Sequence, residues 1–220
     1  MKKRVLSSML IPFVILACSG EAQTTQPAET TPEKDPVIVE QMKLVSVAQD
    51  SLPEACTFEG ELFDAYSWYD KNNKNYLIRS SKTESVSDFN SNAWIYVYIY
   101  NEHYDGTFKK FNEVRDSILE CEFDILANHI GLNINCIDVN EDGIAEITVA
   151  YRLDCFSDVS PRNQKLYLFE NGNSYKMEGY SYLFMDDIGG NITDSSEMMS
   201  APTSEYYESA KRYWENVMAE

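Results

Sequence analysis

The stretch Trp94-Ile-Tyr-Val-Tyr-Ile-Tyr100 decides the fold class of this chain of 220 residues. Side chains of a β-strand point alternately to its two faces, so the aromatic residues of this stretch share one face and the branched aliphatic residues share the other. Neither face is polar, which is typical of a strand covered on both sides. An aromatic face can also form a platform for sugar rings. We favour a core strand whose tyrosine hydroxyls reach the rim.

Strand and turn signals continue on both sides of this stretch. Asn171-Gly172 is the strongest hairpin signal, because this dipeptide adopts the left-handed backbone that tight turns need. The polar run 70–75 is a second turn between two strands, and 81–92 is expected to be a loop. Strands are predicted at 37–47, 60–68, 76–80, 132–137, 144–151, 165–169 and 174–178.

Two segments have helical spacing. Phe111 to Leu119 has apolar residues at 111, 114 and 118, with Asn112 as a possible cap, so it predicts a short helix. Ser204 to Met218 carries an apolar stripe from Tyr206 to Val217, with Thr203 or Ser204 as the cap, and is expected to pack on a sheet. The predicted fold class is α+β, mainly antiparallel β-sheet with a short mid-chain helix and a C-terminal helix.

The N-terminus has the pattern of an export signal. Basic residues at 2–4 precede a 13-residue apolar run, 5–17, which is shorter than the roughly 20 residues that span a bilayer. The run ends in Ile15-Leu-Ala-Cys18, which resembles the lipobox of bacterial lipoproteins. The resemblance implies cleavage after residue 17 and acylation of Cys18 by chains such as palmitate. Ser19 at the next position resembles outer-membrane sorting, either facing the periplasm or exposed on the surface.

Composition separates the remaining chain into two parts. Residues 18–36 hold the acylated Cys18 and a Thr-, Pro- and Glu-rich stretch that predicts a disordered tether, and 37–220 fit one β-rich domain. Removal of Lys2, Lys3 and Arg4 leaves 18 − 3 = 15 basic residues against 36 acidic ones, a net charge of −21. This charge argues against nucleic acid and anionic membrane surfaces as partners.

Four cysteines follow Cys18: Cys56, Cys121, Cys136 and Cys155. Disulfides are expected in an exported protein, and four cysteines allow three pairings. The chain has no Cys-x-x-Cys, and its two histidines, His103 and His129, share no ligand spacing, so zinc is not expected.

The run Asp138-Val-Asn140-Glu-Asp142-Gly143-Ile144-Ala-Glu146 has the spacing of a calcium loop. Oxygen side chains at positions 1, 3 and 5 converge when Gly at position 6 permits a tight turn, and the Ile144 carbonyl and Glu146 carboxylate can complete the cage. Position 12 is Val149 rather than Glu, and a strand follows, so the motif is not an EF-hand. It resembles the Asp-x-Asn-x-Asp-Gly calcium loops of FG-GAP and related β-propeller repeats, but this chain has one copy, so a propeller is not implied. A metal-free polar turn is the alternative.

A wider resemblance covers roughly residues 55–218. The motifs that carry it are 138–146, Tyr151-Arg-Leu-Asp-Cys155, Ser157-Asp-Val-Ser-Pro161 and Lys165-Leu, with looser matches at Trp68-Tyr-Asp70, Asn75, Cys121-Glu-Phe-Asp124 and Tyr213-Trp214. Through these motifs the chain resembles a family of exported proteins labelled as surface polysaccharide biosynthesis proteins. The resemblance implies a Cys121–Cys155 disulfide and leaves Cys56 with Cys136. Proximity around the loop would instead pair Cys136 with Cys155.

These observations predict a lipid-anchored, non-catalytic protein of the cell envelope. It would support surface polysaccharide assembly, or bind a glycan or an envelope protein, with Ca²⁺ as a structural ion at Asp138, Asn140, Asp142, Ile144 and Glu146. The chain has no Gly-x-Ser-x-Gly elbow and no phosphate-binding Gly-rich loop. A periplasmic or surface glycan hydrolase is the alternative, based on the acidic and aromatic composition alone.

Overall fold

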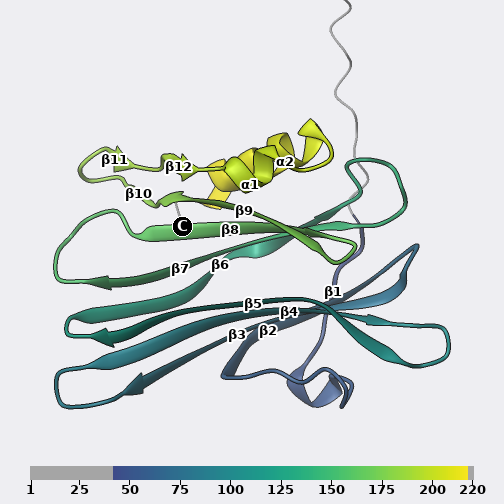
Figure 1. Ribbon diagram of the computed structural model, residues 1–220, viewed down its shortest axis with the longest axis horizontal. Helices are drawn as coiled ribbons and strands as arrows, with labels where there is room; N and C mark the ends of the chain where they lie inside the picture. The colour runs from purple at the N-terminus through teal and green to yellow at the C-terminus, as the bar shows by residue number, and fades with distance from the viewer. Residues whose placement is uncertain (1–41, 218–220) are drawn as a thin grey trace, which may run out of the picture. The chain divides into compact units, whose positions relative to one another are not determined.

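The computed structural model describes residues 42–217 of the chain (Figure 1). The predicted signal peptide 1–17, the predicted tether with Cys18, and the first part of the strand predicted at 37–47 lie outside the described residues.

Two five-stranded antiparallel sheets form the body of the described chain. The first sheet has the order β1-β2-β3-β4-β5, with β1 Val45–Ser46, β2 Glu61–Asp70, β3 Asn73–Ser85, β4 Ser91–Glu102 and β5 Phe108–Cys121. The second sheet has the order β12-β9-β8-β7-β6, with β6 Asp124–Ile137, β7 Glu146–Phe156, β8 Asn163–Glu170, β9 Asn173–Tyr180 and β12 Ile192–Asp194. The predicted antiparallel architecture is therefore confirmed.

Four smaller elements complete the fold of the described residues. A two-stranded hairpin pairs β10 (Tyr182–Leu183) with β11 (Ile188–Gly189). A 3₁₀ turn, η1, covers Gln49–Ser51, and α1 covers Ser196–Met199. The predicted C-terminal helix is confirmed as α2, Ser204–Val217.

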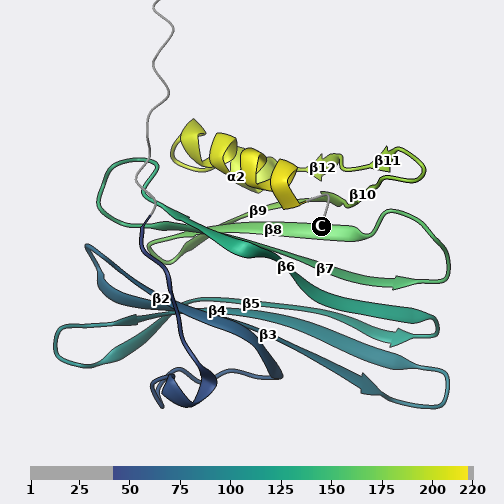
Figure 2. The same cartoon turned by 180° about the vertical axis from the view of Figure 1, so that it is seen from behind.

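The two sheets stack face to face, with the main hydrophobic core between them (Figure 1). Strand β4 supplies Ile95, Val97 and Ile99 to this core, while Tyr96, Tyr98 and Tyr100 point to the outer face of the first sheet. The chain from Val47 to Phe58 packs on these tyrosines, and α2 packs on the outer face of the second sheet (Figure 2).

The aromatic face of β4 is buried core rather than an open platform for sugars. Tyr96, Tyr98 and Tyr100 are each at most 3% exposed. Their hydroxyls lie at the rim, where Tyr100 Oη donates to the Thr57 carbonyl at 2.5 Å and Tyr98 Oη accepts from the Glu59 N–H at 3.2 Å. The core interpretation of this strand is confirmed.

The short helix predicted at 111–119 is wrong, because this segment lies within β5. Strand β5 pairs with β4 from Phe108 opposite Glu102 to Cys121 opposite Ser91. The register shifts between Ile99 and Tyr100 of β4, so β5 carries one extra residue there. That bulge brings Phe111 to the same side as Val114 and Ile118, all of which contact the main core. Strand alternation plus a bulge thus reproduces helical spacing.

The loop predicted at 81–92 is also wrong over most of its length. β3 continues to Ser85 and β4 begins at Ser91, so the connection between them is only 86–90. The register pairs Ser81 with Ile95 and Ser85 with Ser91. Polar side chains are compatible with strand structure here because residues 82–85 are exposed.

The disulfide implied by the family resemblance forms between Cys121 and Cys155, with Cα atoms 5.8 Å apart. It joins the end of β5 to β7 and so links the two sheets. The Cys56–Cys136 pair is a wrong prediction: among the cysteines of residues 42–217 both are free and buried. Cys56 lies in the cluster outside the first sheet and Cys136 lies between the sheets, so the first sheet separates them.

The alternative pairing of Cys136 with Cys155 is wrong as well. Cys136 lies opposite Ile147 in the β6–β7 ladder, whereas Cys155 lies opposite Ile125. Eight residues of strand, or about 26 Å, separate the two positions along β7.

Candidate metal centre and the adjacent pocket

The calcium-type loop, residues 138–146, connects the end of β6 to the start of β7. Its sharp turn uses left-handed backbone at Glu141 (φ 60°) and Gly143 (φ 88°). The turn between β2 and β3 lies against it, because Lys71 donates its backbone N–H to the Gly143 carbonyl at 2.8 Å and its Nζ to the Asp142 carbonyl at 3.1 Å. The loop is therefore fixed to both sheets.

Side-chain oxygens at the first three predicted ligand positions turn into the loop. Asp138 Oδ1 and Oδ2 accept the N–H groups of Asp142 and Gly143 at 3.1 and 2.8 Å. Asn140 Oδ1 accepts from Asp142 N–H at 3.0 Å, and Asp142 Oδ1 accepts from Ile144 N–H at 2.8 Å. Each of these oxygens has a second lone pair, so these bonds hold the oxygens in place and leave them able to meet a cation.

Glu146 is the last of the predicted ligands, and its complete burial (0% exposed) was not expected from the sequence. Its Oε2 accepts from Val139 N–H at 2.6 Å, and the Tyr206 hydroxyl also acts on the carboxylate as a hydrogen-bond donor, whereas Oε1 has no partner of good hydrogen-bonding geometry among the described residues. Burial is the main cause that raises the pKa of Glu146 to about 7. Hydrogen bonds from Val139 N–H and the Tyr206 hydroxyl lower this pKa, and the charges of Asp138 and Asp142 raise it further. A buried carboxylate oxygen without a donor is unfavourable unless a proton or a cation meets it.

Two residues beside the loop were not anticipated from the sequence. Tyr206 of α2, which is 1% exposed, accepts the Asn140 Nδ2–H on its hydroxyl at 2.8 Å. Burial and the charge of Asp142 raise the pKa of Glu170, which ends β8. The apolar stripe of 204–218 predicted that Tyr206 packs on a sheet, but no local pattern could connect it or Glu170 to a loop some 30 to 60 residues earlier.

The structure brings the predicted ligands to one loop without closing a cage. Within residues 42–217, no group of three or more His, Cys, Asp or Glu side chains is placed to hold a metal ion. Asp138, Asn140 and Asp142 share hydrogen bonds, and Glu146 joins them through Val139 N–H. Ile144 lies at the last turn of the loop. The donor set fits a hard cation in chemistry, and calcium remains a proposal.

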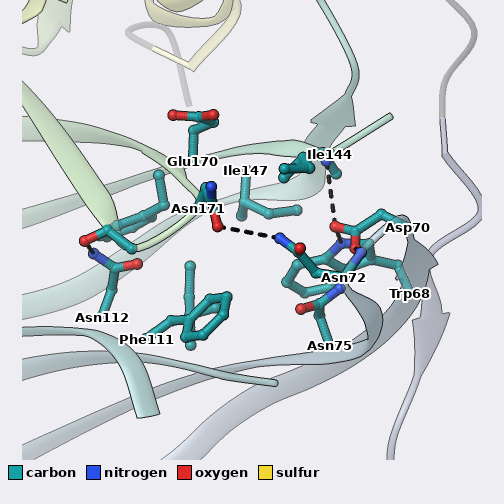
Figure 3. A pocket seen from close by; sticks show the side chains of 14 residues that line it. Trp68, Asp70, Asn72, Asn75, Phe111, Asn112, Ile144, Ile147, Glu170 and Asn171 are labelled. Atoms are coloured by element: carbon teal, nitrogen blue, oxygen red, sulfur yellow. Dashed lines mark hydrogen bonds between the residues drawn. The ribbon is translucent and has the colours of Figure 1, made fainter. Parts of the chain in front are cut away.

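A polar depression lies next to the loop, between the two sheets (Figure 3). Its floor is tied together by Asp70, whose Oδ2 accepts from Trp68 Nε1 at 3.1 Å and from Ala145 N–H at 3.3 Å. Amide side chains bridge its sides. The amides, carboxylates and apolar groups that line it include Asn72, Asn75, Asn112, Asn171, Asp70, Glu170, Trp68, Phe111 and Ile147.

The amide bridges cross from the first sheet to the β8–β9 turn of the second. Asn72 Nδ2 donates to Asn171 Oδ1 at 3.3 Å, and Asn112 Nδ2 donates to the Gly172 carbonyl at 3.0 Å. The cavity volume of the depression is only about 20 Å³, room for about one water molecule, so it cannot enclose a ligand. It has room for a single small polar group, such as one hydroxyl of a larger molecule.

The remaining predicted site residue, Cys18, lies outside the described residues. Among the helices of residues 42–217, none is long and apolar enough to cross a bilayer. Comparison with known proteins adds no identity: no family model, no curated protein and no solved structure matches this chain.

Proposed function

We propose that this chain is a lipid-anchored, non-catalytic protein of the bacterial cell envelope, with a structural calcium ion in loop 138–146. Its role would be to bind a glycan or an envelope protein in support of surface polysaccharide assembly. The observation that supports this most is the buried Glu146 carboxylate, whose Oε1 has no partner of good hydrogen-bonding geometry although Tyr206 and Val139 N–H act on the group, and which lies beside three hydrogen-bonded oxygen side chains. Burial of this carboxylate is unfavourable for the folded state, and a bound cation would offset that cost.

A calcium ion would act mainly by fixing the neighbouring elements. Asn140 connects the loop to α2 through Tyr206, and Lys71 connects it to the β2–β3 turn. A loop ordered by calcium would therefore hold α2 and both sheets together at this end. Extracellular modules with such loops bind calcium with dissociation constants on the order of 10⁻⁴ to 10⁻³ M, and we expect the same range here.

The ligand site proposed for the glycan or protein partner is the polar depression. The carboxamides of Asn72, Asn112 and Asn171 offer both donors and acceptors, and Phe111 provides an apolar wall. Glycans present hydroxyl groups together with apolar C–H faces, so this combination suits them. The net charge of −21 after signal removal favours neutral or cationic ligands over anionic ones.

The anchor and the compartment rest on the N-terminal sequence. The lipobox-like Ile15-Leu-Ala-Cys18 supports attachment to the outer membrane through acyl chains. The Cys121–Cys155 disulfide is compatible with this proposal, since disulfides persist in oxidising compartments such as the periplasm and the cell surface.

The hydrolase alternative would need two carboxylates with different roles on a substrate. Asp116 and Glu178 both line a second depression. Each is paired with a lysine, at 2.6 Å from Lys165 and 3.4 Å from Lys176. Both carboxylates are therefore engaged by side chains of the chain itself and not held free to face a substrate. This arrangement supports the non-catalytic proposal.

Calorimetric titration of the mature chain tests the proposal. Surface polysaccharide from the native cell would be added with calcium and again with a chelator. We expect saturable heat that is lost with chelator and in Asp138→Ala, and retained in Glu215→Ala, which removes an exposed carboxylate of α2 away from the loop. Absence of heat in calcium would contradict direct glycan binding, and heat that persists in chelator would contradict a role for calcium.

A further inference from the structure

Exposed hydrophobic side chains gather at the end of the sheets opposite the calcium-type loop. The most exposed are Phe89 (82%), Val159 (81%) and Met185 (97%). They lie on separate connections: the β3–β4 turn, the β7–β8 loop and the β10–β11 hairpin. We call this surface the apolar end; its other members are Val86, Leu119, Phe123, Phe184 and Ile188.

The tips of the apolar end reach a common level. Figures 1 and 2 show the β3–β4, β5–β6 and β7–β8 connections and the β10–β11 hairpin ending on the same side of the sheets. The antiparallel order requires this, because alternate connections of a meander lie at the same end. Several separate tips at one level match a flat surface better than a contoured one.

Covalent and backbone links hold the tips together. Ser91, at the β3–β4 turn, pairs with Cys121 at the β5–β6 turn, and the Cys121–Cys155 disulfide connects that turn to the β7–β8 loop. Ser181 N–H donates to the Arg162 carbonyl at 2.9 Å, which ties the β10–β11 hairpin to the same loop. The apolar end is thus a prearranged surface, and little ordering is needed when it binds.

The charge of the apolar end selects the kind of surface it can meet. Its basic residues already have partners within the chain. Lys82 forms an ion pair with Glu84 at 2.6 Å, and Arg162 donates a hydrogen bond to the Asp158 carbonyl at 2.7 Å. Acidic residues outnumber them and flank each tip. Repulsion disfavours an anionic bilayer, whereas zwitterionic headgroups offer ammonium groups to the carboxylates. The flanking acids are Glu84, Asp88, Glu120, Glu122, Asp124, Asp158, Asp186 and Asp187.

We propose that the apolar end inserts its tips into the headgroup region of a bilayer of zwitterionic phospholipid. This inference rests on the proposed function, because the lipid anchor is what brings the chain close to a bilayer. The described chain starts at Met42, which bonds to the Cys136 carbonyl near the opposite end of the sheets. The 24 steps from Cys18 to Met42 span at most about 80 Å, more than the roughly 45 Å of a 14-residue strand. The anchor therefore permits the apolar end to face its membrane.

Depth-dependent fluorescence quenching tests the insertion. The full-length acylated chain is reconstituted in phosphatidylcholine vesicles that carry bromine on the acyl chains. Met185→Trp and Phe89→Trp place a reporter on two different tips, and Tyr104→Trp, which replaces an 88% exposed residue on the β4–β5 turn at the opposite end, is the matched control. The spectrum of the wild-type chain is subtracted to remove its three tryptophans.

We expect the two tip reporters to lose more than about half of their added fluorescence, and the control to lose little, because interfacial insertion buries side chains 5–10 Å deep. Vesicles with phosphatidylglycerol should reduce the quenching.

Equal quenching at both ends, or none at either tip in variants that keep the wild-type circular dichroism, would overturn the inference and favour a protein partner. The mass of the purified chain reports the anchor separately: an unacylated Cys18 contradicts the proposed function, while unquenched tips contradict only this inference.

Discussion

The substitution Glu146→Gln separates the cost of the buried carboxylate from its use as a cation ligand. Gln keeps the volume and an oxygen that can accept from Val139 N–H, but it carries no charge. In the folded chain the pKa of Glu146 is raised from 4.5 to about 7, so the native state holds its proton more tightly than the unfolded state does. The resulting stability is complete below pH 4.5, falls as the pH rises through this window, and is lost above about pH 7.

The expected magnitudes follow from this shift. A change in pKa from 4.5 to about 7 corresponds to about 3 kcal/mol, and solvent screening at the loop reduces this to about 2 kcal/mol. Without metal, at about pH 8, Glu146→Gln should therefore raise the free energy of unfolding by about 2 kcal/mol relative to wild type, and at about pH 4.5 the two proteins should be similar. Calcium at about 10 mM should stabilise wild type by about 1.4 to 2.7 kcal/mol for the expected affinity, and the variant much less.

Urea denaturation at both pH values, with calcium or with chelator, measures these quantities. The control is Glu215→Gln, which removes one exposed carboxylate of α2 and should leave both the pH dependence and the calcium response unchanged. The reasoning is refuted if Glu146→Gln is less stable than wild type in chelator at high pH and gains as much from calcium.

Three further predictions concern the core, the disulfide and the link to α2. Burial lowers the pKa of His129 to about 4, so the contribution of this residue to stability should fall by at most about 3 kcal/mol as the pH drops from 6.5 to 4, against the opposite contribution of Glu146 in the same window. In urea denaturation His129→Gln should therefore gain stability relative to wild type on acidification, and a pH dependence identical to that of wild type would exclude a contribution of His129. Loss of the Cys121–Cys155 bond, which closes a separation of 34 residues, should cost about 4 kcal/mol in a double Ser variant. Non-reducing peptide mapping should find this pair, and four free thiols would contradict it. Tyr206→Phe removes the acceptor of the Asn140 amide and should lower stability by about 1 kcal/mol and weaken the calcium response in thermal unfolding, whereas wild-type values of both would disconnect α2 from the loop.

Local sequence patterns correctly predicted the elements whose burial and turn geometry depend on their own residues. Alternation over 94–100 identified β4 because both of its faces are covered, and Asn171-Gly172 identified the β8–β9 turn. The 111–119 segment misled because a bulge in β5 imitates helical spacing, which depends on the partner strand and not on the segment itself.

Sites assembled from segments far apart in the chain could be predicted from the sequence only in part. The spacing of Asp138, Asn140 and Asp142 is local, so the loop could be recognised from the sequence. Tyr206 and Glu170 reach it through the packing of α2 and β8, which no local pattern encodes. The unpaired Cys56 and Cys136 were missed for a related reason, since their separation by the first sheet is a property of the stacked layers.

A crystal structure of the mature chain grown in calcium would show whether loop 138–146 binds the ion. We predict one ion in this loop, bound by oxygens of Asp138, Asn140, Asp142 and Glu146 Oε1 at about 2.3 to 2.6 Å, with the Ile144 carbonyl turned toward it. A loop that keeps its present hydrogen bonds at millimolar calcium, with no ion and with Glu146 Oε1 still unpaired, would contradict it.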